Sequence, residues 1–294
     1  MRRGRLLLPL LGALGPVALG ACGTAGESGS AEQAEARGLT LVDADGREVR
    51  LARPAERLVS LVPSATLTLA ALGASSALVA RTDHDTASWT APLPSVGGGL
   101  QPSLEAIVAA RPDLVIRFSG PQDTRTPAGL DQLGIPHVGI RPDRIADVLE
   151  SIRLLGRATG RDAAADSLVA RIESGLDSVR ASASGRPPVR VAYVLGGDPP
   201  WVAGPGTYID ELLRLAGGEN VFADLGTLYA AVSVEEFLAR QIDLLITPDA
   251  GRIDPRVLGA APVSEVGDAL ELPGPGVTEA AWTLARILRP PGAP

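Results

Sequence analysis

Short apolar runs alternate with amphipathic stretches along most of this 294-residue chain. Near the start, LTLVDADGREVRL at 39–51 places two alternating segments around an Asp-Gly pair, which predicts a β-hairpin with a tight turn and a positive φ. Continuous apolar runs, which are typical of strands in a sheet covered on both faces, follow at 57–62, 77–81 and 133–140. Helical stretches separate these runs, so we predict an α/β lobe over 39–141.

The first apolar run ends at Pro63, and ATLTLAALG after it predicts a helix over 65–73. Ser64 can cap the amino end of this helix, because a serine hydroxyl accepts hydrogen bonds from the first free N–H groups. Gly73 is a typical residue at a helix end. The expected order in the first lobe is therefore strand, capped helix, strand.

Two consecutive helices are predicted between 144 and 184, with apolar positions at helical spacing in both and Gly156 and Gly160 at the joint. The second helix has about 20 residues and would be roughly 30 Å long, which is more than a crossover within one sheet requires. We assign 142–184 to connecting helices that include one long backbone helix. The α/β pattern then resumes, which predicts a second lobe over 185–294 that ends in a helix at 275–290.

One stretch of the first lobe is repeated in the second at an offset of 130 residues. PSLEAIVAARPDLVI at 102–116 and VSVEEFLARQIDLLI at 232–246 each predict a short helix followed by a buried strand. Their shared polar positions are Ser103, Glu105 and Asp113 in the first copy and Ser233, Glu235 and Asp243 in the second. We therefore predict an α/β fold of two similar lobes with parallel central sheets, joined by one long backbone helix.

The first residues have the features of an export signal. MRRGR is positively charged, LLLPLLGALGPVAL is apolar but too short and too rich in Gly and Pro to span a membrane, and small residues precede Cys22. LGAC at 19–22 resembles a bacterial lipobox, in which the cysteine carries the lipid and becomes the mature N-terminus. We predict a lipoprotein signal peptide at 1–21 and a flexible tether at 22–38; an ordinary signal peptide is the alternative.

Composition excludes several classes of protein. Cys22 is the only cysteine, so a disulfide within the chain and a cysteine-based zinc site are excluded. Removal of the signal peptide takes away three arginines and changes the formal net charge from −7 to −10. An acidic chain without a basic cluster argues against nucleic acid as a partner, because phosphate contacts need arginine or lysine.

Catalytic and metal-binding patterns are weak. The chain has two histidines, and His137 lies amid strand-like residues, which favours a structural role. His84 belongs to Asp-His-Asp at 83–85, where we favour a loop with capping aspartates over a metal site. Nucleophile elbows, phosphate loops and dinucleotide fingerprints are all missing. We therefore expect neither an enzyme nor an intrinsic cofactor or directly bound metal, and a hydrolase remains a remote alternative.

A ligand cleft between the lobes is the favoured kind of site. Aromatic residues make up only 3 % of the chain, yet Trp89, Phe118, Trp201 and Tyr229 all fall in predicted connections rather than within elements. Small-molecule clefts favour such aromatics at the carboxyl ends of parallel strands. Gly99 and Tyr229 each lie six residues before the glutamate of their lobe, so a glycine in one lobe corresponds to an aromatic in the other.

Glu105 and Glu235 start the two repeated helices. A serine cap with an acid in the first turn is favourable locally through the helix dipole. That effect explains one glutamate but not the matched placement in two lobes. The pair suits docking to a symmetric partner that carries arginines.

Several segments resemble class III periplasmic solute-binding proteins, which serve importers of cobalamin, haem and iron–siderophores. They are RLVSLVPSATLTLAALG, LPSVGGGLQPSLEAIVAARPDLVI, GPGTYIDELLRLAGGENVFADLG and VSVEEFLARQIDLLIT. The resemblance implies two lobes with limited hinge motion, and it implies that Glu105 and Glu235 dock on a dimeric ABC permease with its ATPase. It further implies a monomer that is exported and held by its lipid on the membrane, facing the periplasm or cell exterior. The implied cleft residues are Ser64, Trp89, Gly98, Gly99, Phe118, Trp201 and Tyr229.

Within that family the cobalamin-binding branch is the most similar, which implies a cobalt corrinoid as the ligand, with His84 as a stacking or axial contact. Other small-molecule metal chelates stay open. A ferric siderophore would use a basic cleft, for which the chain offers Arg81, Arg117, Arg141 and Arg252. Haem would use His84 or Tyr229 as axial ligand. A chelate-binding lipoprotein that works without a permease is a further alternative. The segment 253–273 is short and lacks tryptophan, so the rim of the cleft is expected to be reduced there.

Overall fold

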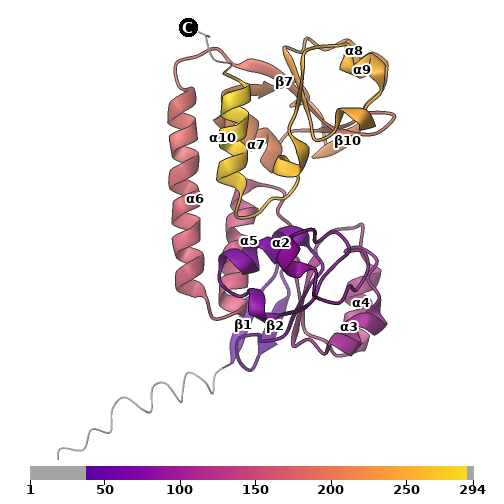
Figure 1. The fold of residues 1–294 in the computed structure, drawn as a ribbon, viewed down its shortest axis with the longest axis vertical. Helices are drawn as coiled ribbons and strands as arrows, with labels where there is room; N and C mark the ends of the chain where they lie inside the picture. The colour runs from indigo at the N-terminus through magenta and orange to yellow at the C-terminus, as the bar shows by residue number, and fades with distance from the viewer. Residues whose placement is uncertain (1–37, 290–294) are drawn as a thin grey trace, which may run out of the picture. The chain divides into compact units, whose positions relative to one another are not determined.

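The computed structural model describes residues 38–289, which contain one larger β-sheet in each lobe and a separate two-stranded sheet in the N-terminal hairpin (Figure 1). The predicted signal peptide, Cys22 and almost all of the predicted tether lie outside this range. The sheet of the first lobe has four parallel strands in the order β4-β3-β5-β6. Their bounds are Leu78–Ala80 for β4, Leu58–Ser60 for β3, Leu114–Phe118 for β5 and His137–Ile140 for β6. All residues of β3 and β6 are buried, as the apolar runs predicted.

The sheet of the second lobe is mixed. Strands β7 (Val189–Gly196), β9 (Gly218–Asn220), β11 (Leu244–Thr247) and β12 (Val263–Glu265) are parallel. Strands β8 (Trp201–Ala203) and β10 (Tyr229–Ala231) are antiparallel and extend the sheet beside β7. The prediction of a parallel sheet is therefore right for its centre and wrong for this edge. The connection from β7 to β8 has only four residues, which permits a hairpin and not a crossover.

The N-terminal hairpin is present as strands β1 (Leu39–Val42) and β2 (Glu48–Leu51). Its turn is wider than predicted, because Val42 pairs with Glu48 and leaves five residues in the loop. Gly46 has the expected positive φ of 75°. The carboxylate of Asp43 accepts the Asp45 and Arg47 amides at 3.0 and 2.9 Å, which stabilises this larger loop in place of a two-residue turn.

Helix α2 (Pro63–Ala71) begins earlier than predicted. Pro63 occupies its first turn, where the missing N–H costs nothing, and Val62 is the N-terminal flanking residue. Ser64 therefore lies inside the helix and does not cap it, which corrects the predicted role. The remaining short helices are α3 (Leu104–Ala110), α4 (Arg125–Gln132), α7 (Tyr208–Leu215), α8 (Val234–Leu238) and α9 (Pro255–Leu258).

Helices α5 (Ile145–Ala158) and α6 (Asp162–Ala183) connect the two sheets, as predicted. The 22 residues of α6 give a length of about 33 Å. This helix packs against α5 and against the final helix α10 (Val277–Ile287), and Figure 1 shows α6 running beside both. Its predicted apolar face is buried. Within residues 38–289, no helix is long and apolar enough to cross a membrane.

The internal repeat is visible in the hydrogen bonds as well as in the elements. Ser103 accepts the Ala106 amide at the start of α3, and Ser233 accepts the Glu236 amide at the start of α8. Before the following strands, the carboxylate of Asp113 accepts the Arg57 amide, and that of Asp243 accepts the Arg190 amide, each at 3.0 Å. Each aspartate thereby joins a repeated strand to the neighbouring strand of its own sheet.

Candidate ligand cleft and docking face

Three adjoining hollows share Phe118 in their lining; one lies in the first lobe, and the other two are lined by residues of both lobes. Their volumes are about 630, 410 and 770 Å³. Phe118 ends strand β5, so the hollows open at the carboxyl edge of a parallel sheet, where ligand sites of α/β proteins gather. We call the three hollows together the interlobe cleft. Taken together they exceed the roughly 300–1,000 Å³ of a usual small-molecule pocket, which favours a large ligand.

The first hollow lies in the first lobe and is lined mainly by apolar atoms and backbone. Predicted residues His84, Gly98 and Gly99 line it together with Phe118. A Cβ on Gly99 would collide with the carbonyl oxygen of Leu61, so this glycine permits a close approach of two backbone segments. Gly99 and Tyr229 occupy equivalent positions of the repeat but line different hollows. Gly99 lines the first hollow, and Tyr229 lines the second and the third.

The second hollow joins the lobes, with Ser64 and Phe118 from the first and Tyr208, Tyr229 and Glu271 from the second. Burial raises the pKa of Tyr229 to about 12, with a smaller contribution from Asp143. Burial also raises the pKa of Glu271, and nearby Asp268 adds to this effect. This hollow therefore favours uncharged hydrogen-bonding groups over phenolate or carboxylate.

The third hollow contains Trp201 and Tyr229 in addition to Phe118. The two aromatics begin the paired antiparallel strands β8 and β10, and Phe118 is the last residue of β5, so the prediction that these aromatics lie in connections was wrong for all three. Trp201 is 45 % exposed, which is unusual for a large aromatic and leaves its indole available to a ligand. The short hairpin strands place both side chains at the lobe interface.

One predicted cleft residue lies outside the three hollows, and two residues that line them were not predicted. Trp89 lies in a 3₁₀ turn at Ser88–Thr90, is exposed, and is not among the residues that line the three hollows. Its role in binding stays a prediction. Tyr208 and Glu271 line the second hollow without having been singled out. Tyr208 had the pattern of a helix core residue, and Glu271 follows a stretch without regular periodicity, so neither gave a usable signal.

The cleft is not basic. Among the residues that line the three hollows, Arg141 is the only arginine, and its Nε lies 2.6 Å from the carboxylate of Asp143. Arg81, Arg117 and Arg252, which were considered for an anionic chelate, do not line them. Arg117 is almost completely buried and bonds Asp45 and His137 instead.

The Asp-His-Asp segment is a capped loop, as favoured from the sequence. Asp85 accepts the Thr82 amide and hydroxyl, each at 2.7 Å, and Asp83 accepts the Ser95 hydroxyl at 2.5 Å. In the part of the chain that the structure describes, no group of three or more His, Cys, Asp or Glu side chains is arranged to hold a metal ion. His84 remains beside the first hollow as a residue that could contact a ligand.

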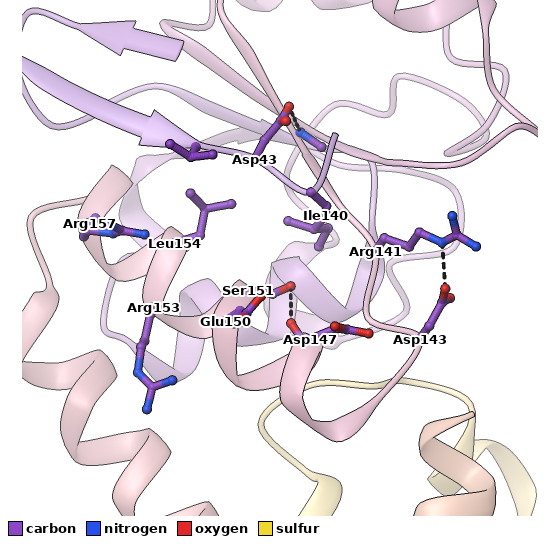
Figure 2. A pocket seen from close by; sticks show the side chains of 13 residues that line it. Asp43, Ile140, Arg141, Asp143, Asp147, Glu150, Ser151, Arg153, Leu154 and Arg157 are labelled. Atoms are coloured by element: carbon purple, nitrogen blue, oxygen red, sulfur yellow. Dashed lines mark hydrogen bonds and ion pairs between the residues drawn. The ribbon is translucent and has the colours of Figure 1, made fainter. Parts of the chain in front are cut away.

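A fourth hollow of about 620 Å³ lies between the N-terminal hairpin and α5 (Figure 2). Its lining is rich in charged side chains, among which Arg141 pairs with Asp143, and the Ser151 hydroxyl donates to the backbone carbonyl of Asp147. None of the predicted cleft residues lines it.

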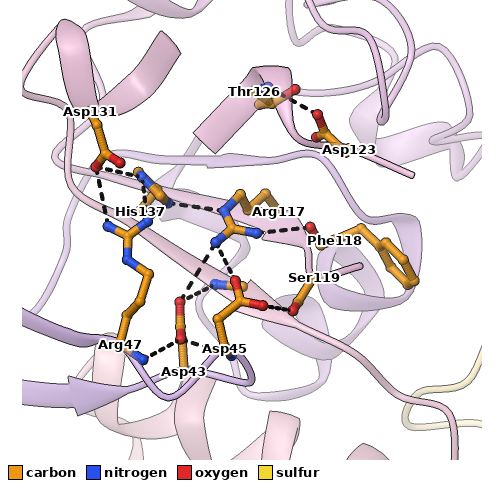
Figure 3. A network of polar contacts seen from close by, with 11 residues as sticks. Asp43, Asp45, Arg47, Arg117, Phe118, Ser119, Asp123, Thr126, Asp131 and His137 are labelled. Atoms are coloured by element: carbon orange, nitrogen blue, oxygen red, sulfur yellow. Dashed lines mark hydrogen bonds and ion pairs between the residues drawn. The ribbon is translucent and has the colours of Figure 1, made fainter. Parts of the chain in front are cut away.

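His137 is a structural histidine, as the sequence favoured. It is 1 % exposed, and its ring nitrogens lie 3.0 Å from Arg117 Nε, 3.0 Å from Arg47 Nη1 and 3.1 Å from Asp131 Oδ1 (Figure 3). Burial lowers the pKa of His137, and the charges of Arg47 and Arg117 lower it further, against an opposing effect of Asp131.

Stability is expected to fall in mildly acidic solution because of His137. The unfolded chain takes up a proton near the ordinary histidine pKa of 6.5, whereas the folded chain resists protonation until a lower pH. The unfolded state therefore binds more protons in this window, and the free energy of unfolding falls as the pH drops from 6.5 through the lowered pKa. Urea unfolding at several pH values should show a shallower fall for His137→Gln; equal slopes for both chains would contradict this account.

The exposed faces of α3 and α8 carry matching side chains. Glu105 and Glu235 are exposed in the first turns of their helices, and neither lines the cleft. Three residues further, Val108 and Leu238 are 45 % and 48 % exposed. Residues three apart share a helix face, so each lobe presents a carboxylate beside an apolar side chain. The internal repeat therefore includes matching exposed side chains on α3 and α8 as well as matching helices and strands.

Comparison with known proteins assigns the class. A family model described as "Periplasmic binding protein" matches residues 58–255. This chain thus belongs to the periplasmic binding proteins, and its fold is that of the class III substrate-binding components of ABC importers. It is similar to a cobalamin-binding protein of Halobacterium salinarum, with 33 % identity over 270 residues that cover 86 % of this chain and 72 % of the relative.

Solved structures agree on the fold. The periplasmic vitamin B12 binding protein BtuF of Vibrio cholerae superposes with a TM-score of 0.68 at 24 % identity, over 80 % of this chain and 97 % of that one. The periplasmic heme-binding protein RhuT from Roseiflexus sp. RS-1 gives a TM-score of 0.67 at 26 % identity, over 80 % of this chain and 99 % of that one. The predicted fold of two α/β lobes with one backbone helix is thereby confirmed.

Proposed function

We propose that this chain captures cobalamin or a related corrinoid in the interlobe cleft and delivers it to an ABC permease. The observation that carries the proposal is the character of the cleft, which is large, lined by Phe118, Trp201 and Tyr229, and has one arginine that is already paired. A corrinoid suits such a cleft because its ring is broad and its edge carries uncharged amides. The relative from Halobacterium salinarum is named for cobalamin binding, which supports the same ligand.

Haem is the second candidate, favoured by the presence of Tyr229 in two hollows and by the similarity to a heme-binding protein. One feature weighs against it. Haem carries two carboxylates, and the single arginine among the residues that line the cleft already pairs with Asp143. An anionic ferric siderophore is disfavoured by the same shortage of free cations.

Delivery is proposed to use the matched faces of α3 and α8. A dimeric permease presents two equivalent surfaces, and two similar lobes of one chain can contact both at once. Glu105 and Glu235 would bind arginines there, while Val108 and Leu238 would add apolar contact. The lipid on Cys22, placed by the lipobox-like LGAC, would keep the exported chain at the membrane. We expect the chain to act as a monomer without catalytic activity.

Thermal unfolding with a panel of ligands tests the ligand class. Cyanocobalamin at about 100 times its dissociation constant should stabilise the folded chain by about 2.7 kcal/mol, which raises Tm by roughly 5–10 °C. Haemin and a ferric hydroxamate at the same concentration should give smaller shifts. A larger shift with haemin would assign the cleft to the second candidate, and a shift with none of them would reject the chelate family.

A further inference from the structure

The two residues that flank Phe118 both donate hydrogen bonds to the carboxylate of Asp45 in the N-terminal hairpin (Figure 3). Arg117 and Ser119 are each 2 % exposed. Nη2 of Arg117 lies 2.5 Å from Oδ2 of Asp45, and the Ser119 hydroxyl donates to Oδ1 of the same side chain. Phe118, which lies between them and lines all three hollows of the cleft, is therefore held from both sides by Asp45.

The loop that presents Asp45 is itself ordered by hydrogen bonds. Asp43 accepts the Asp45 amide through Oδ1 at 3.0 Å and the Gly139 amide through Oδ2 at 3.0 Å. The Ala44 amide donates to the Gly139 carbonyl at 2.9 Å. A Cβ on Gly139 would come within 3.0 Å of both Asp45 Oδ2 and the Ser119 Cβ. The hairpin loop, the edge of β6 and the end of β5 thus pack with little free space.

Asp45 is the nearer of two carboxylates beside Arg117. The guanidinium donates hydrogen bonds to His137 through Nε at 3.0 Å, to the Phe118 carbonyl through Nη1 at 3.1 Å and to Asp45 through Nη2, whereas Oδ2 of buried Asp43 lies 3.9 Å from Nη2. A buried cation that loses its close ion pair is unfavourable, so the guanidinium moves toward Asp43, water or another partner. Because Arg117 also bonds the Phe118 carbonyl, such a movement would displace the end of β5 that carries the aromatic ring.

We propose that Asp45 is a positioning residue for the ligand cleft. Through Arg117 and Ser119 it holds the Phe118 ring in the orientation that forms a wall common to the three hollows. The hairpin that supplies Asp45 lies outside the segment 58–255 that matches the family model. The consequence for binding rests on the proposed function, whereas the orientation of Phe118 does not.

Fluorine NMR tests the orientation directly, because the chain has only three phenylalanines. Incorporation of 4-fluorophenylalanine labels Phe118, Phe222 and Phe237, and the variant Phe118→Leu identifies the first resonance. Phe222 and Phe237 are fully buried and pack in a separate core cluster of the second lobe. Asp45→Ala should move the Phe118 resonance toward that of the free amino acid and leave the other two in place.

Asp131→Ala is the matched control. Asp131 belongs to the same polar network and bonds Arg47 at 3.2 Å and His137 at 3.1 Å, but it bonds neither neighbour of Phe118. We expect it to leave the Phe118 resonance unmoved. Asp45→Asn keeps an acceptor for Ser119 and loses the charge, so it should give an intermediate shift. If Asp45→Ala does not fold, Asp45→Asn and Ser119→Ala carry the test, and an unmoved Phe118 resonance in these variants would overturn the proposal.

Binding supplies the second readout. With cyanocobalamin as the probe, Asp45→Ala should bind about 2- to 12-fold more weakly, the effect of leaving one aromatic side chain unordered before binding. Asp131→Ala should bind like the unaltered chain. If both variants weaken cyanocobalamin binding equally, the role of Asp45 is structural rather than specific to Phe118, and the proposal is overturned. If the unaltered chain binds no cyanocobalamin, the proposed function fails, while the fluorine measurement still decides the role of Asp45.

Discussion

Phe118→Ala is expected to weaken cyanocobalamin binding by at least about 30-fold, which is the loss typical of truncating a central aromatic anchor. The ring of Phe118 lines all three hollows of the cleft, so its removal takes a contact surface away from every part of a bound ligand. Calorimetric titration measures the change. Because Phe118 is half-buried and packs against the main core, Tm should be recorded with each titration.

Trp282→Ala is the control for this prediction. Trp282 lies on α10, is 38 % exposed, and does not line the three hollows. Its truncation removes an aromatic ring of larger area and should leave the dissociation constant as it is in the unaltered chain. An affinity for cyanocobalamin that survives Phe118→Ala would contradict the assignment of the interlobe cleft as the binding site.

The double variant Glu105→Ala with Glu235→Ala should reduce ligand uptake by cells at least about tenfold, since close charge pairs across an interface contribute on the order of 1.5–7 kcal/mol. Ligand affinity of the purified chain should not change, because neither glutamate lines the cleft. Uptake of labelled cyanocobalamin is measured in cells that carry the variant as their only copy. Each single variant should retain part of the uptake, because the other lobe still docks.

The matched control replaces two other exposed glutamates, Glu150 on α5 and Glu219 on β9. It changes the net charge by the same two units but leaves the faces of α3 and α8 intact. Uptake with this control should stay near that of the unaltered chain. If both double variants lose uptake equally, general charge rather than docking at the repeated helices would account for the result.

The order of helices and strands could be predicted from the sequence because the patterns that predict them are local and occur in both lobes. The apolar runs gave the parallel strands, the spacing in 144–184 gave the two connecting helices, and Ser103 and Ser233 gave the starts of α3 and α8. Each of these signals depends on neighbours within a few residues. The offset of 130 residues then related the two lobes without any knowledge of their contacts.

Some features were missed or misplaced. The error at Ser64 has a local cause, because Pro63 occupies the first turn of α2 and thereby places Ser64 inside the helix. The hairpin turn widened because Asp43 bonds backbone amides of its own loop and of β6. The hydrogen bonds from Arg117 and Ser119 to Asp45 join residues that are 72 and 74 positions apart in the sequence, and no local sequence pattern predicts them. Trp201 and Tyr229 were found by their scarcity as aromatics rather than by their structural setting.

The central claim is that the interlobe cleft binds a corrinoid, and calorimetric titration of the purified chain with cyanocobalamin tests it most directly. The account predicts saturable heat at a ratio of one ligand per chain, with much weaker heat from haemin and from a ferric siderophore. The aromatic and uncharged lining of the cleft is the reason for this order. Absence of heat with cyanocobalamin at high micromolar concentration, together with saturable binding of haemin or the siderophore, would contradict it.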